Sequence, residues 1–530
     1  MRKPIPILPL LLLPFSVLAQ VEGPSATLEN DILSTLLGPS LRLFQVGDVE
    51  SQGLTFTPED TGIEQTLIYT SSLWYGGLSE DTLYMTASRY DEPELDDATY
   101  SSFGPISGAY DGAFEALYNR VWAVNRSDIE AHLAQFDSPG YTVPEVLATY
   151  PGNGRSELGE SHLLLPFVDL NDNGLYEPEL GDHPRIRGDR CVTWVVNDAS
   201  NGADDRPHIE TVMQAYVFHD GPVELQHSLF LSAQLRNRSD RDYSDFSIGM
   251  FVDGDVTHFA DNYVGCDADD NYAYTYSPFP ASSIEFGPFG MPSNVATLFP
   301  SDNLYSHMSF LNSAADNGVP FEPAHFYGYL NATWKNGEPL TYGGDGFSDV
   351  NGETLTTSFM YPDFLWAEEE DAWDGLDLPA ADVTHVMAIA PQEFAAGDVR
   401  CFHVAFVASA QFTGLEALYT MDSRVDALQA WWDAQANTDC LETGTVLSES
   451  ARLETADIGL FPNPTTGRVV LNGLSGSSPQ SVVLKDLSGR TVQRHTVSAA
   501  QAEFNVSTLP SGLYFATLEE EGVSLPLIRD

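Results

Sequence analysis

Short segments rich in apolar, β-branched and aromatic residues recur along the chain, and polar or glycine-containing turns separate them. Segments of this kind, bounded by turn residues, are typical of buried β-strands. The polar run 236–242 is one such turn. In the middle of the chain the segments are residues 211–218, 224–237, 246–252, 331–358, 382–391 and 400–411. The pattern predicts a mainly β protein.

Other periodicities add detail near both ends of this region. Residues 66–89 predict two strands joined at the glycine-rich sequence Tyr75, Gly76, Gly77 and Leu78. Short helices are expected at residues 111–119 and 127–136, the second capped by Ser127 or Asp128. Residues 415–436 predict a longer helix, because apolar residues recur there at helical spacing. Those residues are Leu415, Leu418, Val425, Leu428 and Trp432.

The last seventy or so residues form a separate pattern. The sequence LFPNPTTG at residues 460–467 is a turn signal, because two prolines fix φ and Asn, Thr and Gly favour turns. Short apolar segments follow, with Gly, Ser or Pro between them, at residues 468–471, 481–487, 491–495, 502–506 and 512–518. This spacing predicts a small antiparallel sandwich.

The N-terminus has the pattern of a secretory signal peptide. Arg2 and Lys3 precede an apolar run at residues 5–18, and small residues precede a cut ahead of Gln20. No Cys follows the cut, so we do not expect a lipoprotein. No later apolar run reaches the roughly eighteen residues that a membrane-spanning helix needs. We therefore expect a mature chain without a transmembrane segment, located outside the inner membrane.

These patterns predict a multidomain organisation. We expect a signal peptide at residues 1–19, an N-terminal β-rich region at 20–209 and a second β-rich region at 210–440. A polar linker at 441–457 and a C-terminal domain at 458–530 follow. The expected fold class is a mainly β, multidomain β-sandwich body with a few short helices, followed by an Ig-like C-terminal domain.

The composition is strongly acidic. The chain has 77 Asp and Glu residues against 23 Lys and Arg residues, and a formal net charge of −54. Nucleic acid and anionic lipid are therefore poor partners for this chain. Two explanations stay open: adaptation to high salt, which would screen the repulsion, or carboxylate clusters that bind calcium. An apolar content of 43% is sufficient for packed cores and argues against a disordered acidic chain.

Four cysteines occur, at Cys191, Cys266, Cys401 and Cys440. None lies in a CxxC or Cys/His spacing, so the spacing does not favour zinc or thiol redox chemistry. An exported chain passes an oxidising compartment, where disulfides form. We expect a bridge between Cys401 and Cys440, with buried thiols as the alternative.

The C-terminal pattern also resembles a known family. The blocks FPNPTTGRVVL, VVLKDLSGRTV and FNVSTLPSGLYFATL, with a short final strand, are similar to the type A C-terminal sorting domain of the bacterial type IX secretion system. The resemblance implies contact with the type IX machinery and export across the outer membrane. It also implies release or attachment to surface lipopolysaccharide. The family usually ends on a basic residue, and here only Arg529 offers that charge.

The body resembles large, functionally uncharacterised secreted proteins that carry the same sorting domain. This resemblance rests on successive blocks between residues 40 and 435, and it implies secretion and a β-rich extracellular body but no reaction. The blocks include TLIYTSSLWYGGLSEDTLYMTASRY, RVWAVNRSDIEAHL, FVDLNDNGLYEPELGDHPRIRGDRCVTWVVND, MFVDGDVTHFADNYVGCD, KNGEPLTYGGDGF and SFMYPD.

A calcium-type loop begins at Asp169. Oxygen side chains at its first, third and fifth positions precede Gly174, as at the start of an EF-hand loop. Position 12 is Leu180 instead of an acid, so closure would need Glu177, Glu179 or Asp182. The expected calcium ligands are Asp169, Asn171, Asn173, the carbonyl of Leu175, Glu177 and Asp182. The alternative is a solvated turn without an ion.

Two further acidic clusters are weaker candidates. The first has acidic and amide side chains around Gly254 and Gly265, which would repel one another unless they are solvated or bridged by a cation. Its members are Asp253, Asp255, Asp261, Asn262 and Asp267. The second consists of Asp345, Asp349, Asn351 and Glu353. Calcium and an exposed acidic loop are the alternatives for both.

Motifs of catalysis are missing from the sequence. It contains no GxSxG, HExxH, Walker or GxGxxG motif. Trp366 and Trp373 beside the acidic run 368–371 are better interpreted as buried aromatics than as sugar-stacking residues. We therefore expect a noncatalytic structural or adhesive protein stabilised by calcium, with lipopolysaccharide or extracellular glycans as possible partners. The alternative is a secreted hydrolase acting on polysaccharide or peptide.

Overall fold

A computed structural model of the chain divides into two compact units, Met1–Thr445 and Val446–Asp530, each of which is described by itself. The described residues of the first unit, the body, are 24–46, 53–90, 101–200, 205–257, 259–277, 291–347, 355–362 and 381–435. Those of the second unit are 459–461, 465, 467–472, 480–486, 490–497, 501–510, 512–518 and 523–529. The expected signal peptide, linker and Cys440 lie outside these residues, as do Asp349, Asn351, Glu353, Trp366 and Trp373.

The first sheet of the body has ten strands that pair antiparallel, in the order β1-β2-β4-β5-β14-β19-β18. Strands β3 and β6 pair with β5, and β20 pairs with β14. The strands are β1 (Ala26–Glu29), β2 (Leu33–Leu37), β3 (Arg42–Leu43), β4 (Leu54–Phe56), β5 (Gln65–Ser79), β6 (Thr82–Thr86), β14 (Tyr243–Gly254), β18 (Leu304–Leu311), β19 (Val383–Ile389) and β20 (Gln392–Phe394).

The second sheet has nine strands in the order β15-β16-β17-β21-β13-β12-β11-β7, and β8 also pairs with β11. The strands are β7 (Ser102–Phe103), β8 (Trp122–Asn125), β11 (Arg190–Asn197), β12 (Ile209–Val217), β13 (Ser228–Asn237), β15 (Tyr263–Asp267), β16 (Tyr272–Tyr276), β17 (Ser293–Leu298) and β21 (Val399–Ala410). A separate ribbon pairs β9 (Phe167–Val168) with β10 (His183–Pro184).

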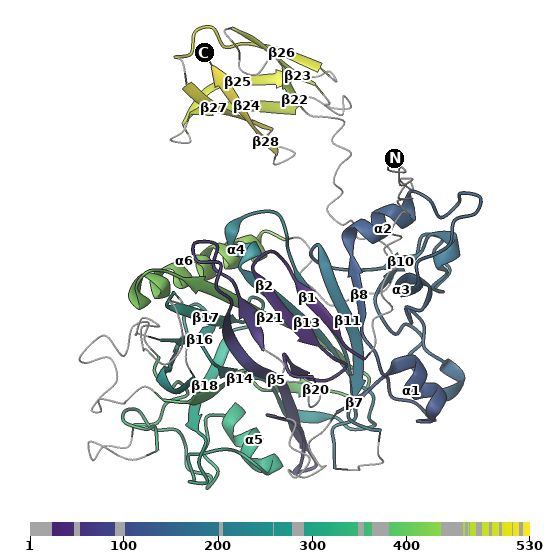
Figure 1. The fold of residues 1–530 in the computed structure, drawn as a ribbon, viewed down its shortest axis with the longest axis vertical. Coiled ribbons are helices and arrows are strands. Elements are labelled where there is room, and N and C mark those ends of the chain that lie inside the picture. The colour runs from purple at the N-terminus through teal and green to yellow at the C-terminus, as the bar shows by residue number, and fades with distance from the viewer. Residues whose placement is uncertain are drawn as a thin grey trace, which may run out of the picture. The chain divides into compact units, whose positions relative to one another are not determined.

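The two large sheets pack face to face around one hydrophobic core (Figure 1). From the first sheet, Leu73 and Met250 are fully buried in this core, and from the second sheet Met213 and Phe406 are. Every residue of β12 is buried, because the strand lies between β11 and β13 and both of its faces are covered. The expected mainly β sandwich is confirmed.

Helices and loops cover the outer faces of the sheets. Helix α6 (Gly414–Asp433) and the short α4 (Val223–Gln226) pack on the second sheet. Helix α5 (Pro323–Leu330) covers the outer face of the first sheet, where Trp74 and Phe251 stack. Between β7 and β11 the chain forms α1 (Gly112–Tyr118), α2 (Arg126–Leu133), α3 (Glu145–Ala148) and the 3-10 turns η2 (Ser156–Leu158) and η3 (Pro178–Leu180).

The expected turn at Gly76 and Gly77 is wrong. Strand β5 continues through both glycines, and the turn comes later, at Glu80 and Asp81, which adopt φ of +49° and +64°. The glycines are needed for close strand approach instead, since a Cβ on Gly76 would lie 2.5 Å from the carbonyl oxygen of Tyr84.

Two of the expected helices match closely but differ in their caps or ends. Helix α6 begins after Thr413, whose hydroxyl accepts a hydrogen bond from the Glu416 N–H, and Val425 and Trp432 are buried as expected. Leu415 is exposed instead. Helix α2 begins one residue before the expected range, and its cap is Asn125, with Asp128 completing the capping box. Ser127 is not the cap, because the backbone is already helical at Arg126.

The expected boundary between residues 209 and 210 lies inside the body. Strand β5 pairs with β14, and β11 pairs with β12, so both sheets combine strands from before and after this position. The residues before 210 therefore do not form a compact unit of their own, because their sheet hydrogen bonds depend on later strands.

The C-terminal unit consists of a three-stranded sheet and a four-stranded sheet, in the orders β22-β23-β26 and β25-β24-β27-β28. Buried apolar side chains include Leu471, Val483 and Ala516. The strands are β22 (Gly459–Phe461), β23 (Arg468–Asn472), β24 (Gln480–Asp486), β25 (Thr491–Val497), β26 (Gln501–Asn505), β27 (Gly512–Leu518) and β28 (Val523–Arg529). Strands β23 to β27 match the five expected segments to within a few residues, and β28 is the short final strand.

The cysteines differ in their chemistry. Cys401 is disulfide-bonded, whereas Cys191 and Cys266 are buried thiols. Burial raises the pKa of the Cys191 thiol to about 11, so this group is not a nucleophile at neutral pH. The expected partner of Cys401, Cys440, lies outside the described residues, and the pairing stays a prediction.

Candidate functional site

The Asp169 loop follows β9 and ends in the turn η3. Its first carboxylate closes the loop, because Asp169 Oδ2 accepts a hydrogen bond from the Gly174 N–H at 2.6 Å. Gly174 has a φ of +78°, which explains the requirement for glycine at the sixth position. Asp172, which precedes the turn, has a φ of +57°. The backbone thus turns sharply where the sequence pattern expects it to.

Side-chain oxygens and amides of the loop converge. The amide nitrogens of Asn171 and Asn173 lie 3.4 Å and 2.5 Å from the same carboxylate oxygen of Glu177. The second carboxylate oxygen of Asp169, Oδ1, is buried and has no hydrogen-bond partner. A buried carboxylate oxygen without a donor is costly, and either a hydrogen-bond donor or a cation would satisfy it.

Asp182 fixes the far end of the loop. Its side chain is fully buried, and its two oxygens accept hydrogen bonds from the N–H groups of Leu170 (2.9 Å) and Glu177 (2.8 Å). The side chain of Leu175 is exposed, and its N–H donates to Asn173 Oδ1. Asp182 therefore serves the loop through backbone hydrogen bonds, which was not part of the sequence-based expectation.

Hydrogen bonds anchor the loop to neighbouring segments of the same chain. The Asn153 side chain donates to the Gly174 carbonyl at 3.0 Å and accepts from the Tyr176 N–H at 2.7 Å. The Tyr176 hydroxyl in turn donates to the Leu147 carbonyl at 2.8 Å. These contacts hold the loop in one conformation, so that the oxygens do not have to be organised by a ligand alone.

A second candidate is a pocket of about 220 Å³ at the end of β14. Asp253 lies in β14 opposite Thr384 of β19, and on the same face as Phe251, which belongs to the outer face of the first sheet. The strand pairing brings residues that are far apart in the sequence to one cavity. The lining residues are Tyr69, Tyr90, Asp253, Asp255, Phe259, Asn312, Val319, Asp382 and Thr384. We call this cavity the Asp253 pocket.

Asp253 is the most perturbed acid of the pocket. Its side chain is 5% exposed; Oδ2 accepts a hydrogen bond from the Tyr90 hydroxyl at 2.8 Å, and Oδ1 has no partner. Burial raises the pKa of Asp253 to about 7, and the charge of Asp255 adds to the shift, while Tyr90 and Arg89 oppose it. Partial desolvation also raises the pKa of Asp382, although this residue is largely exposed. The pocket is thus poised to change its charge near neutral pH.

The structure does not bring the other predicted members of this cluster to the pocket lining. Asp261 ends the 3-10 turn η4 (Phe259–Asp261), and Asn262 is buried beside it. Asp267 lies at the end of β15, where Oδ1 accepts hydrogen bonds from the N–H groups of Asp269 and Asp270. Asp267 therefore stabilises a turn.

Sequence reasoning missed Tyr90, Asn312 and Asp382. No local motif could have found them, because they meet Asp253 only through strand pairing. Of the third predicted cluster, only Asp345 lies among the described residues, where it accepts hydrogen bonds from Asn317 and the Phe347 N–H. Within the described residues, no group of three or more His, Cys, Asp or Glu side chains is arranged to hold a metal ion.

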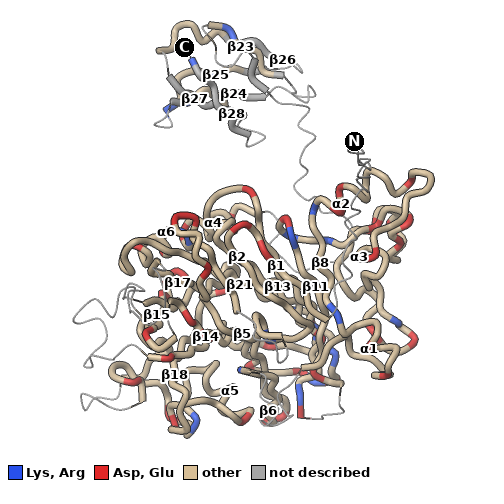
Figure 2. Tube along the Cα trace, in the orientation of Figure 1, with Lys and Arg blue, Asp and Glu red and all other residues tan. Residues whose placement is uncertain are grey.

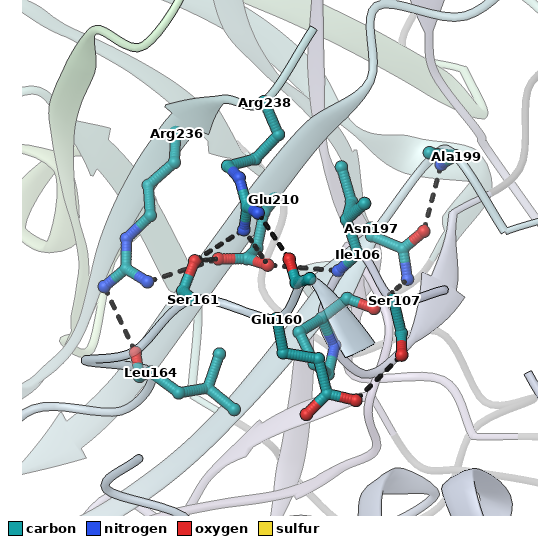
Figure 3. Close-up of polar contacts among 12 residues, drawn as sticks. Ile106, Ser107, Glu160, Ser161, Leu164, Asn197, Ala199, Glu210, Arg236 and Arg238 are labelled. Carbon is teal, nitrogen blue, oxygen red and sulfur yellow. Dashed lines mark hydrogen bonds and ion pairs between the residues drawn. The ribbon is translucent and has the colours of Figure 1, made fainter. Parts of the chain in front are cut away.

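A third group of buried charges is fully paired (Figure 3). The Glu210 carboxylate of β12 accepts hydrogen bonds from Arg236 (3.2 Å) and Arg238 (3.0 Å), and also from Ser161 and the Ile106 N–H. The two arginines continue to carbonyl oxygens of residues 159, 163 and 164. This network attaches the long segment between β7 and β11 to the second sheet.

Glu160 extends the same arrangement. It accepts hydrogen bonds from the Arg155 side chain at 2.6 Å, from the Tyr118 hydroxyl at 2.6 Å and from Ser107 at 2.8 Å. Burial raises the pKa of Glu160, but the bonds from Arg155 and Tyr118 outweigh it and lower the pKa overall. Because its carboxylates are matched by donors, this network has a structural role.

Acidic positions occur in many loops of the body, whereas basic positions are few (Figure 2). Within the described part of the chain, none of the helices combines the length and the apolar character needed to cross a membrane.

Comparisons with known proteins identify the C-terminal unit. Residues 459–525 match the family described as the secretion system C-terminal sorting domain. The match confirms the prediction from the sequence: the chain is a cargo of the type IX secretion system, and it is secreted or displayed at the cell surface. The implied partner is the type IX secretion machinery.

None of the curated proteins matches the chain. A solved polysaccharide lyase structure covers 66% of this chain and 37% of its own length, at 8% identity and a TM-score of 0.20, which is too weak a likeness to support an argument. The resemblance of the body to large uncharacterised proteins stays a prediction.

Proposed function

We propose that the exported body is a noncatalytic structural or adhesive surface protein, in which calcium in the Asp169 loop stabilises the fold. The observation that carries this proposal is the buried Oδ1 atom of Asp169, which has no hydrogen-bond partner although the rest of the loop is tightly bonded. Calcium prefers oxygen ligands and would satisfy this atom.

The loop's neighbours support the same conclusion. The amide groups of Asn171 and Asn173 lie close to the Glu177 carboxylate, so rotation of these side chains would present oxygen atoms to an ion. Binding to the folded state alone would add stability outside the cell by mass action. Calcium would also offset part of the net charge of −54. Surface lipopolysaccharide and extracellular glycans are the partners that we propose for such a protein.

Thermal unfolding of the exported chain tests this proposal. The melting temperature is measured with calcium, with magnesium and after EDTA, at fixed high salt, for the wild type and for Asp169→Ala and Asn171→Ala. We expect a calcium-specific rise that both variants lose and that the exposed control Asp60→Ala retains. If EDTA and calcium leave the melting temperature unchanged, the loop is a solvated turn and the acidity reflects salt adaptation.

One observation favours a second candidate, a secreted hydrolase acting on polysaccharide or peptide. The Asp253 pocket combines Asp253, whose pKa is about 7, with Asp255 and Asp382, and two of these three carboxyl groups can serve as acid and base. Turnover of a polysaccharide or peptide that Asp253→Asn abolishes, with calcium kept constant, would establish this function. Its absence over a broad substrate panel supports the noncatalytic proposal.

A further inference from the structure

We propose that the Asp253 pocket binds an organic monovalent cation, an ammonium or guanidinium group carried by a small ligand or a side chain. The pocket's charge is the first argument. Asp253, Asp255 and Asp382 line it, and among the described residues no lysine or arginine does. The nearby Arg89 side chain lies over the Tyr90 ring, 5.3 Å from its centroid, and offsets only part of this charge.

The second argument is the unmatched oxygen of Asp253. Its Oδ2 atom has the Tyr90 hydroxyl as donor, whereas Oδ1 has none, although 95% of the residue is buried. An N–H group of a bound cation would supply the missing donor as a charge-assisted hydrogen bond. Glu210, another buried strand carboxylate, already has such donors from Arg236 and Arg238. By analogy, a cation from outside the chain would donate to Asp253 as Arg236 and Arg238 donate to Glu210.

The aromatic lining distinguishes an organic cation from a metal ion. Tyr69 is 36% exposed and Phe259 is 51% exposed, and both line the cavity together with Tyr90. Aromatic faces attract ammonium and guanidinium groups, whereas calcium prefers six to eight oxygen ligands. The volume of about 220 Å³ accommodates a cation of the size of a methylguanidinium or propylammonium ion.

Protonation of Asp253 competes with the cation. The groups that face this carboxyl are Tyr90, Asp255, Asp382 and Arg89, and together with burial they leave its pKa at about 7. A cation binds the ionised form, so binding weakens as the pH falls through 7. This inference does not depend on calcium in the Asp169 loop, which lies on a different part of the chain.

Calorimetric titration of the exported chain with methylguanidinium, and separately with propylammonium, tests the inference at constant calcium and ionic strength. We expect saturable binding of at least one cation at pH 8, and affinity about tenfold or more lower at pH 5. Methylurea, the neutral analogue of methylguanidinium, should not bind. The Asp253→Asn variant should lose about tenfold or more in affinity, because it removes the charged acceptor.

Further variants keep the result interpretable. Asp382→Asn changes an exposed position and should weaken binding several-fold without affecting folding, even if Asp253→Asn unfolds. Asp60→Asn, which changes an exposed acid elsewhere, should leave the affinity unchanged. Asp169→Ala should retain cation binding while it loses calcium, which separates this inference from the proposed function.

Three results would overturn the proposal that the Asp253 pocket binds an organic cation. The first is that neither cation binds the wild type at pH 8. The second is that Asp253→Asn or Asp382→Asn binds as tightly as the wild type. The third is that calcium displaces the organic cation from the pocket, or that the pocket turns over a substrate, because either would assign Asp253 to a metal site or a catalytic site.

Discussion

Glu210 and Asp253 are both strand carboxylates with almost no exposure, 0% and 5%, yet their surroundings are opposite. Glu210 has two arginines, a hydroxyl and a backbone N–H as donors. Asp253 has one hydroxyl donor and two further carboxylates beside it in a cavity. The donors around a buried acid, and not its burial, therefore separate a structural group from a candidate binding group.

The largest expected effect comes from removing the Glu210 carboxylate, which is paired with two arginines. Glu210→Gln leaves Arg236 and Arg238 without their carboxylate, and we expect a loss of about 3–5 kcal/mol in the free energy of unfolding. Denaturant unfolding at pH 7 measures it, with the exposed Glu59→Gln as a matched control. A loss no greater than that of the control would show that the network does not hold the fold.

Asp253→Asn should raise the free energy of unfolding, whereas Glu210→Gln should lower it. The folded pKa of about 7 lies above the value of 3.8 for an unperturbed Asp, so the folded state binds more protons between these pH values. The wild type therefore loses stability as the pH rises through this window, and the variant does not. We expect the variant to be more stable by up to about 4 kcal/mol at pH 8 and similar to the wild type near pH 4. A destabilised variant at pH 8 would contradict the comparison.

Tyr90→Phe removes the hydroxyl that donates to Asp253 and keeps the ring contacts of Tyr90 with Phe251 and Tyr69. We expect the pKa of Asp253 to rise further, and stability at pH 8 to fall by about 1 kcal/mol. Carboxyl NMR of Asp253 as a function of pH measures the first effect, and denaturant unfolding measures the second. An unchanged titration would mean that the hydroxyl does not support this carboxylate.

The smallest effect is expected for Asp382→Asn. The charge of Asp382 raises the pKa of Asp253 only as a minor contribution, after burial and Asp255. Because Asp382 is exposed, its removal should lower that pKa slightly and change stability by less than about 0.5 kcal/mol. The same NMR titration would detect a larger shift. Such a shift would mean that Asp382 contributes more to the pKa of Asp253 than burial and Asp255 do.

Local patterns were readable in the sequence. The turn signal and apolar segments of the C-terminal unit, the helical spacing that defines α6, and the Asp169–Gly174 turn all depend on neighbours within a few residues. The position of the first turn after β5 was misjudged, because Gly76 and Gly77 serve strand packing that only the paired strand reveals.

Contacts between distant residues were not readable. Asp253 meets Tyr90 and Asp382 because β14 pairs with β5 and β19, and no spacing in the sequence encodes that pairing. Likewise Glu210 finds Ser161 and Arg236 through the sheet and the segment that covers it. Acids are abundant in this chain, so composition alone could not select which of them share a cavity.

Direct measurement of calcium stoichiometry tests the central claim, that a buried carboxylate oxygen without a donor marks a ligand site. Equilibrium dialysis at high salt compares the exported wild type with Asp169→Ala and Asp253→Asn. We predict that Asp169→Ala loses one bound calcium ion per chain, whereas Asp253→Asn binds as many as the wild type. Equal calcium binding by the wild type and Asp169→Ala, or none by the wild type, would contradict the account.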